Sequence, residues 1–403
     1  MVIHFNILQT LALAVAVMFL GKYVKRFFKI LDRLCIPDPV VGGILFSLLL
    51  LLGHSTKAFT LEFDLTLQAI CMTAFFTSVG FSCNLRTLPK YGLKGLQFTI
   101  IVFLLVVFQN IIGIAWTKMF GINAYFGLCA GSVSMVGGHG TSGAFAPLFE
   151  QRGCAGALTV AMAAATFGLV SGGLIGGPVA RYITRSHKLA EEKTSEEIDD
   201  TPAEVSSNEP IVADNDLNEK RILSASNQII LAMGIGTLLS MGLTAIGLTF
   251  PGYMGGMLMA VILRNISDIT GLFSTPINEI NCIGNVSLLL FVTMALMTLK
   301  LWQLAELAIP LIVMLMTQVV FITAFLILIG FRILGSDYDA AVMISGICGF
   351  GLGAMPNGVA NMQAFVKKFK PSPTAFFVVP GVGSVIIDVV NALLITAFMG
   401  FIG

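Results

Sequence analysis

Apolar runs of about 20 residues recur along this chain, and they restrict the possible folds more than any other feature, because such a run forms a helix that spans a bilayer. Short polar connections separate roughly ten of them. The sequence is 56% hydrophobic and 11% charged, whereas a typical soluble domain has about 25% charged residues. We therefore predict an all-α integral membrane protein. The predicted spans cover residues 5–21, 38–53, 67–84, 95–117, 155–180, 225–247, 251–263, 281–299, 307–330 and 374–402.

The distribution of Lys and Arg predicts the orientation of these spans, because cytoplasmic loops retain basic residues. With the N-terminus outside, 19 of the 23 basic residues face the cytoplasm. The four that face out are Lys57, Lys118, Arg152 and Lys300. Both termini are then outside, and the number of spans is even. The first apolar run precedes its basic cluster, the reverse of a cleavable signal, so we predict that it stays as a helix.

An acidic stretch at residues 188–221 divides the chain. It carries half of the 22 acidic residues, together with Pro202 and Pro210. This composition is typical of a solvated, disordered segment, and a regulatory or docking role is the alternative interpretation. We predict an N-terminal five-span unit at 1–187, a cytoplasmic linker at 188–221 and a C-terminal five-span unit at 222–403.

The two units show weak but ordered similarity. Gly131, Gly138 and Gly143 match Gly346, Gly353 and Gly358 at one constant offset. Units with an odd number of spans enter the membrane in opposite directions, so this similarity predicts an inverted repeat. Further matches are Gly42 and Gly43 with Gly255 and Gly256, Phe76 with Phe291, and Gln109 with Gln318.

Each unit carries a polar, glycine-rich segment before its last span, and these segments predict re-entrant hairpins near 125–151 and 339–369. Irregular backbone is tolerated at membrane depth only against protein or water, so two such segments in matching places predict a binding site. We expect Thr141 and Ser142 to cap the second half-helix of the first hairpin. In the second hairpin we expect Pro356 at the first helical position with Asn357 beside it.

Helix N-termini carry a partial positive charge and attract carboxylates, whereas the carbonyl ends of half-helices hold small cations. The segments therefore predict a site for an anionic substrate and a cation. The alternative is that their glycines only permit close packing of helices.

Asp388 is the acidic residue deepest inside an apolar run, and an intramembrane carboxylate indicates function by default. Asn391 shares its helical face, so the pair suits an ammonium group or a sodium ion. A purely structural carboxylate is the alternative. Gln109, Asn110 and Gln318 lie near mid-membrane, where they either reach substrate or tie helices together. We interpret His139 as a hydrogen-bonding wall residue, with a proton carrier as the alternative.

Several function classes are disfavoured. The net charge of +1 gives no reason to expect a nucleic-acid partner. The histidines show no metal-ligand spacing, and the seven cysteines contain no CxxC pair, so they read as small core residues. The sequence has no GxSxG motif and no paired mid-span carboxylates. We therefore predict that the chain is not an enzyme.

Over nearly its whole length the chain resembles the bacterial sodium/glutamate symporter family. The residues that carry this resemblance are Ile36–Gly43, Gly137–Thr141, Thr166–Leu169, Gly172–Pro178, Gly284–Leu288, Tyr338–Val342 and Ile387–Asn391. The resemblance implies sodium-driven uptake of L-glutamate across the bacterial inner membrane. It also implies two inverted five-span domains, each with a re-entrant hairpin, and a homodimer with elevator-like motion. Met355 departs from the pattern, because similar family members usually have Thr there, and Ile347 stands where they often have His.

Under this resemblance we expect glutamate carboxylates at the half-helix N-termini and the ammonium near Asp388. The expected substrate-binding residues are Gly137, Gly138, His139, Gly140, Thr141, Ser142, Gly353, Ala354, Met355, Pro356, Asn357 and Asp388. The expected sodium ligands are Ser134, Thr166, Gly351, Asn361 and Asn391, with Gln109, Asn110 and Gln318 as polar support. Sodium is the expected coupling ion, and no organic cofactor is expected. A carrier of citrate-like 2-hydroxycarboxylates is the main alternative function, and a passive channel is a weaker one.

Overall fold

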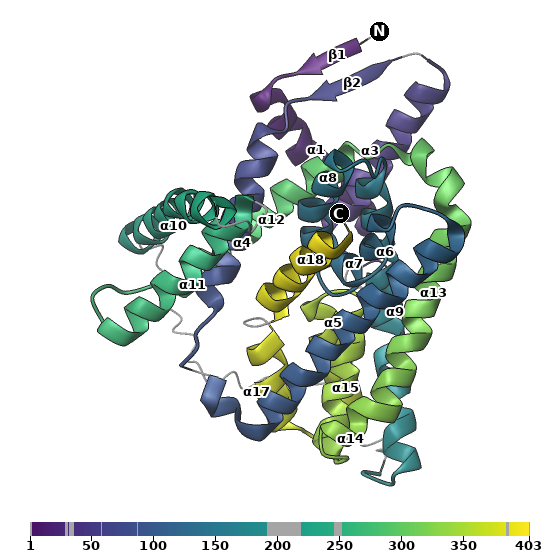
Figure 1. The fold of residues 1–403 in the computed structure, drawn as a ribbon, viewed down its shortest axis with the longest axis vertical. Helices are drawn as coiled ribbons and strands as arrows, with labels where there is room; N and C mark the ends of the chain where they lie inside the picture. The colour runs from purple at the N-terminus through teal and green to yellow at the C-terminus, as the bar shows by residue number, and fades with distance from the viewer. Residues whose placement is uncertain are drawn as a thin grey trace.

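The structure, a computed structural model, describes residues 2–28, 31, 36–57, 59–86, 88–191, 219–245, 252–383 and 387–402. Helices dominate these residues, as predicted, and a two-stranded parallel ribbon of β1 (Val2–Phe5) and β2 (Thr60–Phe63) lies at one end (Figure 1). Seven helices among the described residues are long and apolar enough to cross a membrane. The prediction of a multi-pass helical membrane protein is therefore confirmed. Most of the predicted linker, residues 192–218, lies outside the described residues.

The helices follow in the order of the predicted spans, with extra short helices at the glycine-rich segments. Before the linker the order is α1 (Ile7–Lys25), α3 (Asp38–Ser55), α4 (Thr66–Ser82), η1 (Leu88–Tyr91), α5 (Gly92–Phe120), α6 (Tyr125–Cys129), α7 (Ser132–Met135), α8 (Gly138–Gln151) and α9 (Ala157–Ser186). After it come α10 (Glu219–Ala245), α11 (Gly252–Thr270), α12 (Ile277–Met297), η2 (Leu301–Leu307), α13 (Ala308–Phe325), the π-helical turn η3 (Leu326–Gly330), α14 (Phe331–Ile333), α15 (Tyr338–Gly351), α16 (Met355–Lys368), α17 (Pro373–Val382) and α18 (Asp388–Ile402).

Ten spans were predicted, but only seven helices among the described residues are long and apolar enough to cross a membrane. The lengths and charges of the remaining helices explain the difference. Helix α4 has 17 residues, slightly short of the roughly 20 that cross a bilayer untilted. Helix α11 has 19 residues but carries Arg264 and Asp268 in its second half. The last predicted span contains α17 and α18, which have 10 and 15 residues, and residues 384–386 between them lie outside the described residues.

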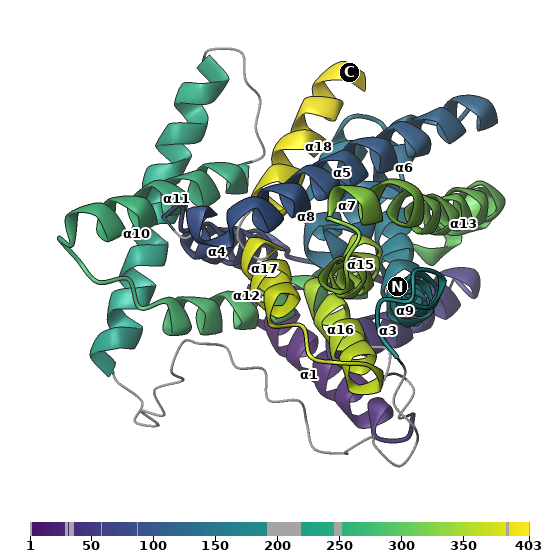
Figure 2. The same cartoon turned by 90° about the horizontal axis from the view of Figure 1, so that it is seen from below.

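The helices pack into two groups, and each group combines helices from before and after the linker. The first, the outer bundle, consists of α1, α3, α4, α10, α11 and α12, in which α4 packs against α11 and α12. The second, the core bundle, consists of α5 to α9 and α13 to α18. Figure 1 shows α10 and α11 beside α4 on one side, and Figure 2 shows α15 and α16 next to α9 within the core bundle.

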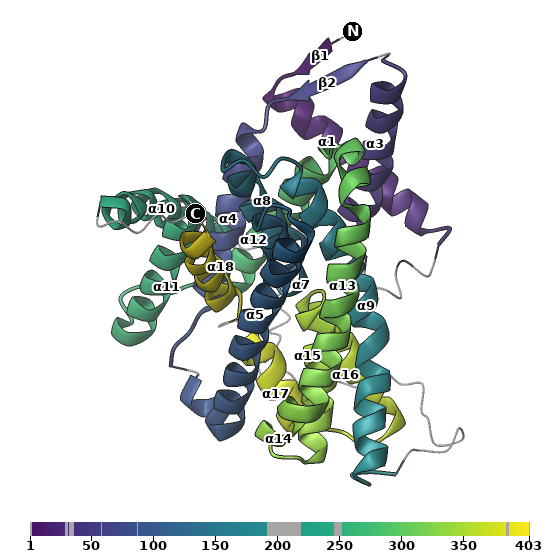
Figure 3. The same ribbon diagram turned by 45° about the vertical axis from the view of Figure 1, so that its right-hand side comes forward.

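Small residues let these helices approach closely, as is typical of helix packing in membranes. A methyl group added to Gly80 of α4 would lie 2.2 Å from the carbonyl oxygen of Met257 in α11. In the core bundle α13 and α9 run side by side (Figure 3). Asp337 caps α15 by accepting a hydrogen bond from the backbone N–H of Ala340 at 2.8 Å, which fixes where the helix begins.

Candidate functional site

The first glycine-rich segment contains a break between α7 and α8. Helix α7 ends at Met135 and α8 begins at Gly138, whose φ of +58° favours glycine. Together α6, α7 and α8 cover residues 125–151. The predicted caps were wrong: Thr141 and Ser142 lie inside α8, and no side chain caps the helix. Because glycine lets the chain turn at residue 138, the helix starts three residues before Thr141.

Polar side chains around the first break bond to α9. The hydroxyl of Ser134 donates to the carbonyl oxygen of Ala161 at 2.8 Å and lies 3.0 Å from the Ser142 hydroxyl. The Nε2 atom of His139 lies 3.0 Å from Oγ1 of Thr166. His139 is thus hydrogen-bonded to α9. Gly137, Gly140 and Thr141 complete the first turn of α8, and Thr141 is 6% exposed.

The second glycine-rich segment contains a break between α15 and α16. Helix α15 ends at Gly351 and α16 begins at Met355, so Pro356 is the second helical residue and not the first. Ala354 precedes α16 in extended backbone, and no side chain caps the helix. Pro356 has no N–H, and the N–H groups of Asn357 and Gly358 donate to the carbonyl oxygen of Ala354. The start of α16 therefore attracts anions through the partial positive charge of a helix N-terminus.

Two asparagines of α16 bond to backbone carbonyls of α9. The Nδ2 group of Asn357 donates to the oxygen of Leu169 at 2.8 Å. That of Asn361 donates to the oxygen of Gly172 at 2.8 Å. A methyl group on Gly168 would lie 2.0 Å from the carbonyl oxygen of Leu352. The second break therefore lies directly against the middle of α9.

The two breaks meet. A methyl group added to Gly138 would lie 3.0 Å from the carbonyl oxygen of Gly353. The terminal methyl of Met355 lies where a side chain on Gly383 would begin, 2.0 Å from that position. The last span thus runs beside the second break at Gly383. It then reaches the first hairpin, where Nδ2 of Asn391 donates to the oxygen of Ser132 at 3.2 Å.

Asp388 lies between these two contacts, in the first turn of α18. Among the described residues its carboxylate makes no hydrogen bond or ion pair, although five ion pairs form elsewhere among them. Asp388 is half-buried, and a cationic partner stabilises a carboxylate that is partly removed from water. The arrangement therefore suits a cation that arrives with the cargo.

Two mid-membrane glutamines connect α5, α13 and α15. The Nε2 group of Gln109 donates to the oxygen of Gly351 at 2.8 Å. That of Gln318 donates to the backbone oxygen of Gln109 at 2.8 Å. Asn110 accepts from the N–H of Ser132 at 2.9 Å. All three predicted support residues are fully buried, and they tie helices together.

Thr166 of α9 was predicted from the sequence, but the backbone carbonyls of this helix and the contribution of Ser132 were missed. Backbone carbonyls of Leu169 and Gly172 hold the second hairpin, and backbone groups carry no side-chain signal. The small residues of this helix, such as Gly168 and Gly172, were the available clue, because they mark a close approach.

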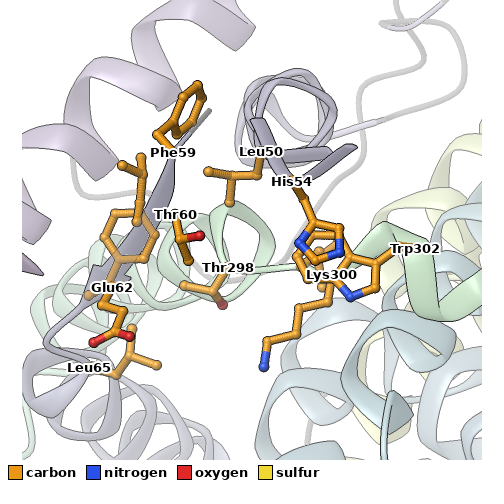
Figure 4. Close-up of a pocket in the computed structure, with 12 residues that line it drawn as sticks. Leu50, His54, Phe59, Thr60, Glu62, Leu65, Thr298, Lys300 and Trp302 are labelled. Atoms are coloured by element: carbon orange, nitrogen blue, oxygen red, sulfur yellow. The ribbon is translucent and has the colours of Figure 1, made fainter. Parts of the chain in front are cut away.

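A surface cavity of about 550 Å³ lies elsewhere, between the β1–β2 ribbon, the end of α3 and the start of η2 (Figure 4). His54 stacks on Trp302 at 3.9 Å between ring centroids, and Lys300 and Glu62 also line the cavity. None of its lining residues belongs to either break. The described residues also contain no group of three His, Cys, Asp or Glu side chains that could hold a metal ion.

Sequence comparisons with known proteins point to one family. A family model described as "Sodium/glutamate symporter" matches residues 3–371. The sodium/glutamate symporter of Haemophilus influenzae is 41% identical over 97% of this chain and 96% of its own. That of Escherichia coli is 39% identical over 98% of both chains. A solved structure of the sodium proton antiporter MjNhaP1 from Methanocaldococcus jannaschii aligns over 98% of both chains with a TM-score of 0.43 and 15% identity.

Proposed function

The chain belongs to the sodium/glutamate symporter family, and from this premise we propose that it takes up L-glutamate with sodium through a site where its two helix breaks meet. The relatives are named as symporters and not as enzymes. The proposed location of the site rests on one observation, the close approach of Gly138 to the carbonyl oxygen of Gly353. It brings the N-termini of two half-helices, each of 14 residues, to one place in the core bundle.

We propose that the substrate carboxylates bind at these two N-termini. The first N-terminus lies around Gly140, Thr141 and Ser142, and the second around Pro356 to Gly358. Because the N–H groups of Thr141, Asn357 and Gly358 already donate to backbone carbonyls, the attraction comes from the dipoles of the two half-helices. Each N-terminus carries a partial positive charge of roughly half a unit. Asp388 then neutralises the ammonium group. The two interactions together recognise an amino acid with an acidic side chain.

Sodium is the coupling ion in this proposal. The predicted ligands differ in whether their oxygen atoms are already engaged in hydrogen bonds. The Gly351 carbonyl already accepts a hydrogen bond from Gln109, and the Ser134 hydroxyl is bonded to α9. Thr166 is paired with His139. Asn361 and Asn391 use their amide N–H groups in hydrogen bonds, which leaves their oxygens for a cation.

The element order supports an inverted repeat of two five-span units. Helix α5 with Gln109 precedes the broken segment of α6 to α8. Helix α13 with Gln318 likewise precedes the broken segment of α15 and α16. We propose that both segments are re-entrant hairpins, and that the core bundle moves against the outer bundle as an elevator. We further propose a homodimer in the bacterial inner membrane.

The proposed orientation has both termini outside and the linker in the cytoplasm, and residues that it assigns to the same side of the membrane contact one another. Residues assigned to the cytoplasmic side contact one another: Nη1 of Arg86 donates to the oxygen of Asp268, and Nζ of Lys94 lies 2.7 Å from Oδ2 of Asp337. On the side assigned to the exterior, His54 stacks on Trp302 near Lys300.

Uptake into proteoliposomes tests the function. We expect labelled glutamate to accumulate inside when an inward sodium gradient is imposed, because the two solutes cross together. Accumulation should vanish when choline replaces sodium on the outside. Uptake that ignores the sodium gradient, or flux that never saturates with glutamate, would contradict the proposal and would favour another driving ion or a channel.

Replacing Gly138 with alanine should weaken glutamate binding. The positive φ strains any other residue by roughly 1–2 kcal/mol, and the added methyl presses on the Gly353 carbonyl, so the breaks separate. We expect the KM for glutamate to rise about tenfold, which corresponds to about 1.4 kcal/mol. Gly92→Ala is the matched control: its φ is +55° and a methyl there meets nothing within 4 Å. Gly92→Ala should introduce the same backbone strain but leave the KM for glutamate unchanged.

A further inference from the structure

A group of five polar residues in the middle of the core bundle, here called the α5 amide cluster, connects both hairpins. Its members come from α5, α7, α13 and α18, and each is at most 1% exposed. They are Gln109, Asn110, Ser132, Gln318 and Asn391. Burial of so many neutral polar groups at one place is costly unless each is paired.

Hydrogen bonds bring these residues together around α5. Ser132 donates its N–H to Asn110 and accepts from Asn391 through its carbonyl oxygen. Gln318 donates to the backbone oxygen of Gln109. Gln109 in turn holds Gly351, the last residue of α15. Adjacent residues of one helix therefore hold the first hairpin at Ser132 and the second at Gly351.

The cluster keeps unpaired polar atoms. Four oxygens have no hydrogen-bond partner among the described residues, one of them the Ser132 hydroxyl, and the NH2 group of Asn110 lacks an acceptor for both of its N–H bonds. The four oxygens are Gln109 Oε1, Ser132 Oγ, Gln318 Oε1 and Asn391 Oδ1. A single buried water has two protons to donate, so it cannot satisfy four acceptors. Even when the two N–H bonds of Asn110 and the Ser132 hydroxyl proton are counted, the unpaired oxygens have more lone pairs than there are protons to fill them. A cation fills such an excess of lone pairs.

We propose that the α5 amide cluster binds a sodium ion, separate from the glutamate site at the breaks. Hard cations prefer oxygen ligands, and the cluster offers neutral amide and hydroxyl oxygens. The absence of a carboxylate from these five residues favours a monovalent ion over a divalent one, because neutral ligands offset less charge. Of the sodium ligands expected from the sequence, only Asn391 belongs to this cluster.

The position of the cluster gives the ion a role in coupling. An ion held there by Ser132 and Gln109 fixes the first hairpin and the end of α15 at the same time. Sodium then orders both breaks before glutamate binds. This inference rests on the proposed function in that sodium is the coupling ion, but the ion site is tested without glutamate.

Thermal unfolding of the purified full-length protein, without glutamate, tests the site. The protein is titrated with NaCl at constant ionic strength, with choline chloride as the balancing salt. A ligand that binds only the folded state raises the melting temperature with its concentration, so the titration has a sodium midpoint. We expect Ser132→Ala and Gln318→Met each to raise this midpoint at least tenfold. Ser132→Ala removes only the unpaired hydroxyl and keeps the backbone bonds to Asn110 and Asn391.

Thr10→Val is the matched control. It removes a buried, unpaired hydroxyl in α1 of the outer bundle and should leave the sodium midpoint unchanged. If Ser132→Ala and Gln318→Met keep the wild-type sodium midpoint, the sodium site is overturned and the cluster binds water instead. Ser132→Ala alone decides the question if Gln318→Met does not fold. A protein that sodium stabilises but glutamate does not would instead contradict the proposed function and leave the ion site standing.

Discussion

Replacing Asp388 with asparagine is expected to abolish glutamate uptake while the protein still folds. Asp388 opens α18 between the contact of Gly383 with Met355 and the hydrogen bond of Asn391 to Ser132. Asparagine has nearly the same size but no charge, so the substrate ammonium loses its partner. Asp388 is half-buried, and leaving a charged group without its hydrogen-bonding partner costs about 3 kcal/mol or more. We therefore expect kcat/KM for glutamate to fall by roughly a hundredfold or more.

The measurement is initial uptake of labelled glutamate into proteoliposomes, with labelled malate as a second substrate. Malate has two carboxylates but no ammonium, so it does not need Asp388. Glu62→Gln is the matched control, because it removes an exposed carboxylate of β2 that pairs with His4 and should leave uptake unchanged. Wild-type glutamate uptake by Asp388→Asn, or malate transport that equals glutamate transport in the wild type, would favour a 2-hydroxycarboxylate carrier.

The positions of the breaks could be predicted from the sequence because glycine-rich, polar backbone is costly at membrane depth unless it meets protein or water. The predicted hairpin at 125–151 covers the residues of α6, α7 and α8. The helix starts were less predictable. Thr141 has the chemistry of a cap, yet the positive φ of Gly138 turns the chain earlier. A backbone conformation decided the boundary, and side-chain preference did not.

Contacts between distant segments were beyond the sequence. Asn391 was expected beside a cation, but its hydrogen bond to Ser132 joins residues far apart in the chain. Likewise nothing in the sequence indicated that Gln109 would hold Gly351. Periodicity and glycine content describe one segment at a time, whereas these pairs depend on how α5, α7 and α18 cross.

The contacts between the two bundles bear on the proposed motion. A methyl group on Gly140 would meet Phe75 of α4 at 3.2 Å, and one on Gly143 would meet Phe291 of α12 at 2.6 Å. The first turns of α8 thus face aromatic side chains of the outer bundle. No ion pair or backbone hydrogen bond described here joins α8 to α4 or α12. Apolar contacts of this kind suit a shear motion of the core bundle against the outer bundle.

Replacing Gly168 with alanine is expected to eliminate transport by separating α9 from the second hairpin. The added methyl would lie 2.0 Å from the carbonyl oxygen of Leu352 and 3.1 Å from its carbon. These are backbone atoms between α15 and α16, so no rotamer change relieves the clash. Overpacking costs about 1–3 kcal/mol, and the shift also strains the neighbouring hydrogen bond from Asn357 to Leu169. We expect a lower melting temperature and glutamate uptake reduced at least tenfold.

Gly177→Ala gives the matched comparison on the same helix. A methyl at Gly177 meets nothing within 4 Å, and alanine stabilises a helix interior by roughly 0.5–1 kcal/mol over glycine. The two substitutions are chemically identical but should shift the melting temperature in opposite directions. Equal effects would mean that α9 tolerates a methyl at either position and that the second break does not depend on close contact with Gly168. The proposed site would then need another support for Asn357, because the oxygen of Leu169 is the partner that holds it.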